Sequence, residues 1–172
     1  MRVSPAICLA LALAALLPAG CAYHLGPTNG EVAGARSVQI APFYNKSPEP
    51  GLGDYLMNSL RKAMQRDSTY RLATHAGEGD IVVTGTILTF QRHELSFVAK
   101  DVITVQDYEL LVSAQIIARE RGTGKILIDK PIRASTSLRA GADLTSSERA
   151  AMPVLAENLA RAAMAVLVDG TW

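Results

Sequence analysis

The sequence predicts an α+β domain: a two-layer sandwich in which a four-stranded mixed sheet carries two helices on one face, in the order β-α-β-β-β-α. Three observations predict this fold class. Two segments repeat apolar residues every three or four positions, which is typical of helices with one apolar stripe. Other segments alternate apolar with polar residues or are rich in β-branched residues, as strands are. Short connections between the later strands favour an antiparallel meander, whereas a helical crossover makes the first two strands parallel.

The first 20 residues have the layout of a secretory signal. Their apolar run, residues 6–17, is shorter than the roughly 20 apolar residues that a membrane-spanning helix needs. Cys21 directly follows Ala19-Gly20, and a cysteine in this place is the acceptor of a bacterial lipoprotein signal, although Pro18 stands where a leucine is usual. Pro18 also argues against the alternative, a core cysteine after an ordinary buried helix. We therefore predict a lipoprotein signal peptide over 1–20 and lipidation of Cys21.

Charge and cysteine content narrow the classes of function. Cleavage after residue 20 removes one arginine and leaves 16 basic against 16 acidic residues, so the basic excess that nucleic-acid binding requires is missing. The two cysteines are Cys8, in the signal, and Cys21, so lipidation leaves no thiol for a disulfide, a metal site or catalysis. Acyl chains on Cys21 would hold the mature protein on a membrane. We expect a membrane partner and no nucleic acid.

The stretch 21–36 is rich in Gly, Pro and Asn and predicts a lipidated tether to a domain over 37–172. Ser37–Phe43 alternates and predicts a half-buried strand, closed by Pro42. A helix is expected next, because four apolar residues fall four apart and Asp67-Ser68 ends the pattern: Leu52, Leu56, Leu60 and Met64. Its basic residues are interpreted as a solvated face, with a binding patch as the alternative: Arg61, Lys62 and Arg66.

Tyr70–Leu72 is expected to begin the next strand, which a turn over 76–80 interrupts and which continues over 81–90. Both faces of that second part are apolar, which favours a central strand. Residues 94–101 are predicted to form a hairpin connection with apolar side chains near its tip: Leu95, Phe97 and Val98. Two interpretations stay open, namely an exposed apolar tip that meets a partner, or side chains folded back under the sheet.

Residues 107–119 alternate most regularly and predict a long strand with one core face and one wetter face. A glycine turn over 121–124 leads to a last strand, which Pro131 marks as an edge because proline cannot donate to a ladder. The second helix is expected to contain Leu155, Leu159, Ala162, Ala163, Val166 and Leu167 and to end at Gly170. We expect Thr145 and Glu148 to form a capping box, and Pro153 to lie in the first turn of a helix that starts later.

No catalytic or metal-binding constellation is visible in the sequence, so we expect neither an enzyme nor a cofactor. The three histidines, His24, His75 and His93, have no suitably spaced partner. One weaker grouping remains. Arg92, Lys100 and Arg133 flank the apolar hairpin or the edge strand, with His93 and Arg139 nearby, and cations beside apolar groups suit an anionic lipid. Scattered solvated arginines are the alternative.

Several stretches resemble one family of bacterial lipoproteins. They are Cys21–Leu25, Val38–Ser47, Glu49–Leu52, the stretch from Gly85 through Phe97, and Tyr108 with Arg121–Lys125. Their order and spacing over the mature chain resemble the LptE family of lipopolysaccharide-assembly lipoproteins. The resemblance implies an outer-membrane, lipid-anchored protein that forms the plug of the LptD β-barrel, with its domain on the periplasmic side or in the barrel lumen. It also implies help in barrel assembly and in the delivery of lipopolysaccharide to the outer leaflet.

The resemblance supplies no site motif, so lipopolysaccharide binding by Arg92, Lys100 and Arg133 is a hypothesis from the residues alone. An alternative is another envelope lipoprotein with a similar strand-then-helix opening, LpoB-like (a synthase activator) or CsgG-like (a secretion component). The short tether over 21–36 favours a partner in the same membrane, because it cannot cross the periplasm. A soluble periplasmic enzyme is a third class, which the missing catalytic constellation opposes.

Overall fold

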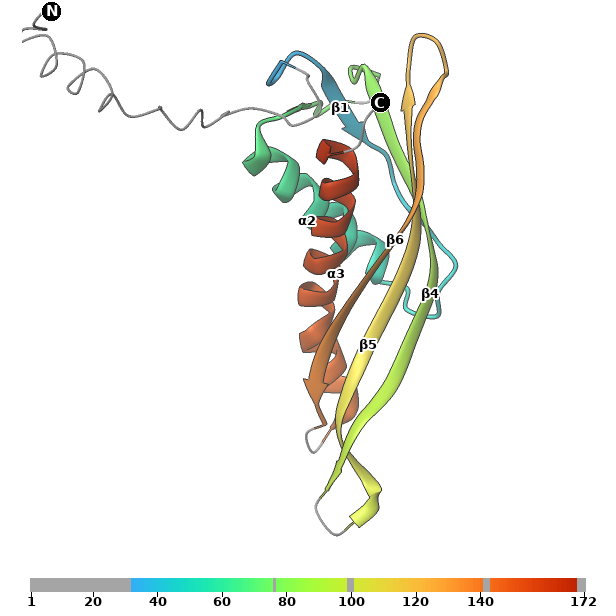
Figure 1. The fold of residues 1–172 in the computed structure, drawn as a ribbon, viewed down its shortest axis with the longest axis vertical. Helices are drawn as coiled ribbons and strands as arrows, with labels where there is room; N and C mark the ends of the chain where they lie inside the picture. The colour runs from blue at the N-terminus through green and yellow to red at the C-terminus, as the bar shows by residue number, and fades with distance from the viewer. Residues whose placement is uncertain (1–31, 76, 99–100, 141–142, 170–172) are drawn as a thin grey trace, which may run out of the picture.

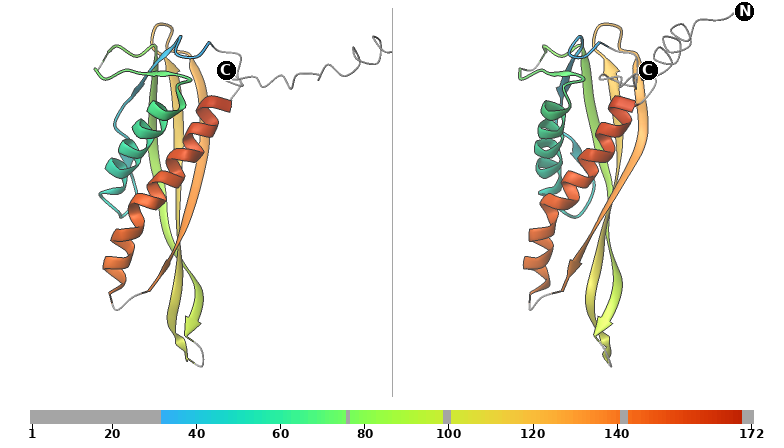
Figure 2. Two further views of the ribbon diagram at one scale, coloured as in Figure 1. Left: turned by 90° about the vertical axis from the view of Figure 1, so that its left-hand side faces the viewer. Right: turned by 60° about the vertical axis from the view of Figure 1, so that its left-hand side comes forward.

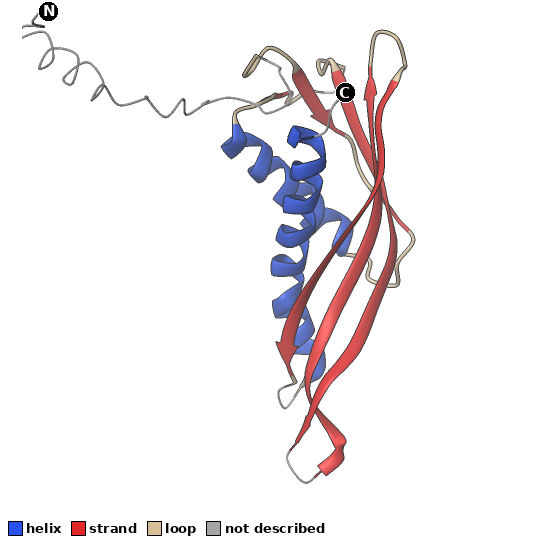
Figure 3. Cartoon of the chain, viewed as in Figure 1, coloured by secondary structure: helices blue, strands red, loops and turns tan. Residues whose placement is uncertain are grey.

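A computed structural model describes residues 32–75, 77–98, 101–140 and 143–169. The predicted α+β class is confirmed, with two helices packed on one face of a mixed sheet (Figure 1). The predicted number of four strands is wrong, because the sheet has six. Figure 3 shows the separation into a layer of helices and a layer of strands. The opposite face of the sheet carries no helix from the described part of the chain.

The elements follow one another as β1 (Ser37–Ile40), β2 (Tyr44–Asn45), α2 (Leu52–Asp67), β3 (Arg71–Leu72), β4 (Ile81–Val98), β5 (Asp101–Glu120), β6 (Ile126–Arg139) and α3 (Leu144–Asp169). In space the strands lie in the order β3-β1-β4-β5-β6, and β2 also pairs with β4. β1 and β2 run parallel to β4, whereas β4, β5 and β6 form an antiparallel meander. The parallel first pairing and the later meander both agree with the sequence.

The sequence predicts that Tyr70–Leu72 begins the strand that continues as β4, and this prediction is wrong. Residues Arg71–Leu72 instead form the separate strand β3 on the other side of β1. Ala73 N–H donates to the Val38 carbonyl at 2.9 Å, and the chain then crosses the end of β1 to enter β4. Asp80 makes this crossing specific, because its carboxylate accepts from the Ser37 N–H at 2.8 Å and from the Ser37 hydroxyl at 2.7 Å. These bonds hold the pKa of Asp80 below its usual value.

A β-bulge at Leu88 explains why both faces of β4 look apolar in the sequence. Before the bulge, the odd-numbered side chains of β4 face the core, and Ile87 pairs with Ala114. Leu88 is 41% exposed. After it, the even-numbered side chains face the core, and Phe90 pairs with Val112. An extra residue in one strand reverses its alternation in this way.

β4 and β5 are longer than predicted. The expected connection over 94–101 is strand up to Val98 and again from Asp101, so these two strands project as a ribbon beyond β6 and the helices (Figure 1). Several register shifts occur in this ribbon, between Glu94 and Val98. Leu95 is 54% and Phe97 43% exposed. These two side chains are therefore exposed rather than folded back under the sheet. The burial of Val98 lies outside what the structure describes.

β6 ends the sheet path, which confirms the edge position predicted from Pro131. α3 lies along this edge (Figure 2). The side-chain amide of Asn158 on α3 donates to the Ser135 carbonyl of β6 at 2.9 Å. This bond occupies one edge carbonyl, and covering an edge in this way limits pairing with other chains.

α2 confirms the first predicted helix, with Leu52, Leu56, Leu60 and Met64 buried. It ends as expected after Asp67, because Ser68 adopts a left-handed conformation with φ of 62°. Its buried stripe packs against α3 and the sheet, where it shares the core with the inward side chains of β4 and β5. The second helix is anchored at its far end by the Tyr70 hydroxyl, which donates to the Leu167 carbonyl at 3.2 Å.

α3 starts earlier than predicted and contains Pro153 in its interior, so the expectation of a later start is wrong. The predicted capping box is wrong as well. Asp143 caps the helix by accepting from the Thr145 N–H at 3.0 Å and the Ser146 N–H at 3.2 Å. A further bond from the Ser146 hydroxyl contributes most to holding the pKa of Asp143 below its usual value. The predicted stop, Gly170, lies outside the described residues.

Burial explains why α3 tolerates its proline. Proline removes one helical hydrogen bond, at a cost of about 3 kcal/mol. Nine residues of α3 are buried, among them Leu155, Leu159, Ala163 and Leu167, and this packing offsets the loss. Among the described helices, α3 alone has the length and hydropathy of a membrane span. Because this stripe packs into the domain, we interpret α3 as a core helix.

Candidate interaction surfaces

The structure separates two of the three cations that the sequence groups together. Arg92 lies on β4 and faces the helices, because it pairs in register with the buried Leu110. Arg133 lies on β6 and pairs with Ser113 on the uncovered face. Lys100 lies outside the described residues, as do Cys21 and His24. Arg92 and Arg133 therefore belong to different surfaces.

Arg92 is held by two carboxylates. Its guanidinium forms an ion pair with Glu148 of α3 through two nitrogens, one at 2.9 Å from Oε2, and lies 3.4 Å from Glu49 in the loop before α2. The guanidinium also lies 5.6 Å from the centre of the Phe90 ring. Glu148 is buried and was expected to cap the helix. We call Arg92, Glu148 and Glu49 the clamp, because they join β4, α3 and a loop.

We predict that Arg92→Leu lowers the free energy of unfolding by about 2 kcal/mol. Losing one partner leaves the buried Glu148 carboxylate unpaired, which costs 3–5 kcal/mol at fully buried sites, and Arg92 is 45% exposed, which reduces the cost. Urea unfolding followed by circular dichroism measures the change. Arg161→Leu, in the exposed Arg161–Glu157 pair, is the matched control and should cost less than about 0.5 kcal/mol. Equal losses in both variants would contradict a role for the clamp.

The uncovered face of β4, β5 and β6 is predominantly polar, and its side chains bond to one another across strands. Thr89 and Ser113 share a hydroxyl bond of 2.6 Å, and the Gln115 amide donates to Asp129. A groove of about 590 Å³ crosses the three strands and is lined by Thr89, Gln91, Leu111, Val112, Ser113, Arg133, Ala134 and Ser135. Arg133 is exposed at this groove and forms no ion pair with any described residue. Its charge is therefore available to an anionic group.

The projecting ribbon combines apolar and polar side chains. Leu95 and Phe97 are exposed, whereas Ser96 donates to the Asp107 carboxylate at 2.6 Å. Arg139, at the end of β6, forms an ion pair with Asp107 at 3.3 Å. The Ser96 bond first, and then Arg139, hold the pKa of Asp107 below its usual value. Arg139 is thus engaged, whereas the two apolar side chains are uncovered by the described chain.

The histidines and acidic residues of the described surfaces form few groupings with one another. Within the described ranges, no group of three or more His, Cys, Asp or Glu side chains is placed to hold a metal ion. His75 contacts only groups in its own turn among the contacts described, including Glu78 at 3.3 Å. His93 is exposed on β4. The surfaces offer hydrogen bonds, single charges and apolar side chains, which are the means of binding.

Two structural contacts could not be predicted from the sequence. The clamp joins residues 56 positions apart, and the only sequence signal was Glu148 at a position assigned to capping. The second contact places Phe43 against Gly85 on the core side of β4, where a side chain on residue 85 would overlap the Phe43 ring. The glycine within a β-branched strand was its signal, because such a glycine marks a close approach.

Comparisons with solved structures place this architecture among small bacterial proteins. A protein from Xanthomonas campestris is 9% identical with a TM-score of 0.61, over 84% of this chain and 90% of that one. A protein from Chlamydia trachomatis is 15% identical with a TM-score of 0.55, over 77% and 95%. A minor lipoprotein from Acinetobacter baumannii is 14% identical with a TM-score of 0.53, over 78% and 93%. These likenesses define the fold. No curated protein sequence matches the chain.

The two-layer fold with an uncovered polar sheet face thus defines an α+β domain of the kind seen in these solved structures. The chain belongs to the LptE family, described as lipopolysaccharide-assembly, whose match covers residues 35–166. It is therefore an envelope-associated lipopolysaccharide-assembly lipoprotein. The family is non-enzymatic, which agrees with the sequence-based expectation. The predicted limits of signal, tether and domain stay predictions, as does the lipidation of Cys21.

Proposed function

We propose that this protein is an outer-membrane lipoprotein that forms the plug of an LptD-type β-barrel, assists the assembly of that barrel and helps deliver lipopolysaccharide to the outer leaflet. The observation that carries the proposal is the polar uncovered face of β4, β5 and β6. Its hydrogen-bonding side chains, such as Thr89, Ser113 and Gln115, suit contact with the polar wall of a barrel lumen. An exposed face of this kind needs no apolar partner to remain in water.

The predicted anchor supports the same partner. A tether over 21–36, attached through lipid at Cys21, would keep the domain close to its own membrane and raise its effective concentration near a barrel there. A partner in the other membrane or in the cell wall would need a longer tether. This argument favours the barrel over the LpoB-like alternative, whose partner is a peptidoglycan synthase.

We assign lipopolysaccharide contact to Arg133 in the groove and, from the sequence, to Lys100 together with the exposed apolar residues of the ribbon. Arg133 forms no ion pair with any described residue and lies in a groove whose lining includes three hydroxyl groups, which suits a phosphate oxygen. Lys100 follows the exposed Phe97 in the chain. Arg92, the third predicted cation, is neutralised by Glu148 and Glu49, so we give it a smaller part in binding.

We predict that Arg133→Glu combined with Lys100→Glu weakens lipopolysaccharide binding about tenfold or more, since each charge-assisted hydrogen bond lost is worth about 1.5–3 kcal/mol. Binding of labelled lipopolysaccharide to the detergent-solubilised full chain measures it. Lys130→Glu is the control for charge, because Lys130 is exposed on the same strand and forms no ion pair with any described residue. Unchanged affinity in the double variant would contradict the assignment.

A further inference from the structure

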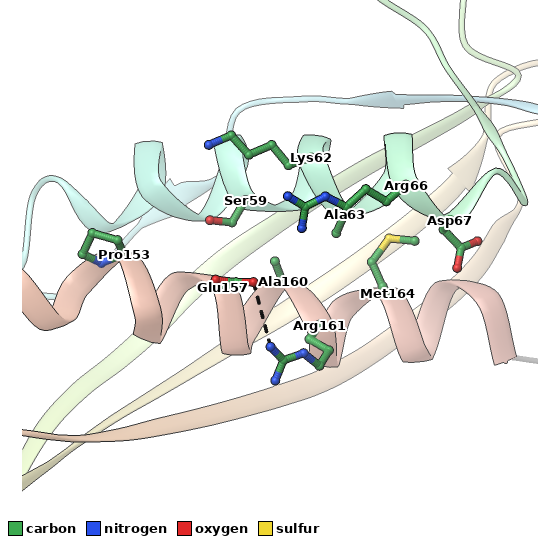
Figure 4. Close-up of a pocket in the computed structure, with 10 residues that line it drawn as sticks. All are labelled: Ser59, Lys62, Ala63, Arg66, Asp67, Pro153, Glu157, Ala160, Arg161 and Met164. Atoms are coloured by element: carbon green, nitrogen blue, oxygen red, sulfur yellow. Dashed lines mark ion pairs between the residues drawn. The ribbon is translucent and has the colours of Figure 1, made fainter.

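The outer surface of the helix layer contains a groove between α2 and α3, far from the uncovered face of the sheet. It has a volume of about 540 Å³ and is lined by Ser59, Lys62, Ala63, Arg66 and Asp67 of α2 and by Pro153, Glu157, Ala160, Arg161 and Met164 of α3. Figure 4 shows the two walls facing one another. The lining positions repeat every three or four residues on each helix, so the groove follows the helix pair.

The floor of the groove is apolar and the side chains on it are small. Ala63 is half-buried and Ala160 is buried, and neither side chain fills the space between the helices. Met164 extends from α3 toward α2 in Figure 4. Small side chains at such positions let a third segment approach both helices closely, in the way that one helix packs into the groove between others.

The charge that the groove leaves available is positive. Three cations line the groove against two carboxylates. Glu157 pairs with Arg161 at 4.0 Å, and Asp67 keeps its charge while it accepts from the Thr69 N–H at 3.2 Å, so a net positive charge remains. Lys62 and Arg66, one turn apart on α2, are exposed and form no ion pair with any residue of the described ranges. In Figure 4 the Arg66 side chain lies along the groove toward Ala63.

We propose that this groove binds an acidic amphipathic helical segment of a partner protein. Acidic side chains one turn apart on that segment would meet Lys62 and Arg66, and its small apolar side chains would cover Ala63 and Ala160. An anionic lipid fits less well, because the floor offers little apolar length for acyl chains. The proposal goes beyond the barrel plug and does not depend on it, since the groove and the uncovered sheet face lie on opposite sides.

The test uses the full mature chain in a nonionic detergent and a labelled 20-residue peptide with glutamates on one face and alanine and leucine on the other. Fluorescence anisotropy should detect binding, and Lys62→Glu with Arg66→Glu should weaken it about tenfold or more, as expected when two charge-assisted contacts are lost. Ala63→Leu, which fills the floor without a change in charge, should weaken it as well. The matched control is Arg61→Glu with Arg149→Glu, the same change in charge outside the groove, which should leave affinity within about twofold.

Several results would overturn the proposal. Equal weakening by the two charge-reversed pairs would show a general charge effect, and equal binding of a peptide with lysines in place of the glutamates would exclude recognition of acidic side chains. No binding of the acidic peptide would do the same. The peptide could fail to bind while the chain binds phosphatidylglycerol vesicles or self-associates. If the Lys62/Arg66 variant then loses that binding or self-association, the groove belongs to another occupant and the proposal is wrong. Copurification of a β-barrel with the Lys62/Arg66 variant tests the plug function separately, because that function does not depend on the groove.

Discussion

Replacing Cys21 by serine is expected to remove the lipid anchor completely. Acyl chains contribute about 0.8 kcal/mol for each buried methylene group, so several chains on one residue hold a protein with a free energy on the order of tens of kcal/mol. To separate lipidation from export, the Cys21→Ser chain is fused to a cleavable secretory signal in place of residues 1–20.

Mass spectrometry of the mature N-terminus and fractionation of cell envelopes measure the effect. The Cys21→Ser chain should lack acyl groups and move to the soluble fraction. Cys8→Ser in the native signal is the matched control, because the predicted cleavage would remove Cys8 with the signal and leave the mature protein unchanged. An acylated N-terminus in the serine variant, or an unmodified Cys21 in the parent chain, would remove the anchor from the account.

A side chain at position 85 is expected to cost more stability than any other change proposed for the folded domain. A Cβ atom on Gly85 would overlap the Phe43 ring and lie 2.8 Å from the Gln115 carbonyl oxygen, which belongs to the backbone of β5. The ring could shift, but the backbone of a central strand cannot do so without breaking its ladder. Gly85→Ala should therefore lower the free energy of unfolding by about 3 kcal/mol, at the upper end of overpacking effects.

Gly122→Ala is the control for the loss of glycine, because nothing lies within 4 Å of a Cβ atom at that turn position. It should change stability by less than about 0.5 kcal/mol. Phe43→Ala combined with Gly85→Ala should relieve the overlap with the Phe43 ring but not the close approach to the β5 backbone, so it should restore only part of the lost stability. If denaturant unfolding gives the same stability for Gly85→Ala and Gly122→Ala, the close approach of Phe43 and Gly85 is not a constraint on the fold.

The elements with strong periodicity could be predicted from the sequence. Leu52 to Met64 fixed the first helix, and the alternation from Tyr108 to Ala118 fixed the core face of β5. Pro131 placed β6 at an edge. In each case the signal is local, because the spacing of apolar side chains alone decides which face is buried.

The remaining features depend on contacts between distant residues. β3 has two residues, too few to show a period, and its place beyond β1 follows from hydrogen bonds made in the folded chain. The bulge at Leu88 reverses an alternation that otherwise looks like two apolar faces. The internal Pro153 contradicts the local rule because the packing of α3 outweighs one lost hydrogen bond.

The candidate site shows the same division. Cys21 is marked by residues adjacent to it in sequence, whereas the fate of Arg92 depends on Glu148 and Glu49, which lie far from it in the chain. Charge and position along a strand were not enough to separate Arg92 from Arg133, because the bulge at Leu88 decides which face Arg92 occupies. A grouping of cations by sequence therefore joined residues that the fold places on two surfaces.

The most direct test of the barrel proposal is the identity of the protein that accompanies the full chain from the membrane. Affinity purification of the tagged chain from detergent-extracted envelopes, followed by mass spectrometry, identifies that partner. The account predicts a large outer-membrane β-barrel of the LptD type in about equal amount, and its loss when the uncovered face is altered by Ser113→Arg with Gln115→Arg. Recovery of a peptidoglycan synthase instead, or of no barrel at all, would contradict it.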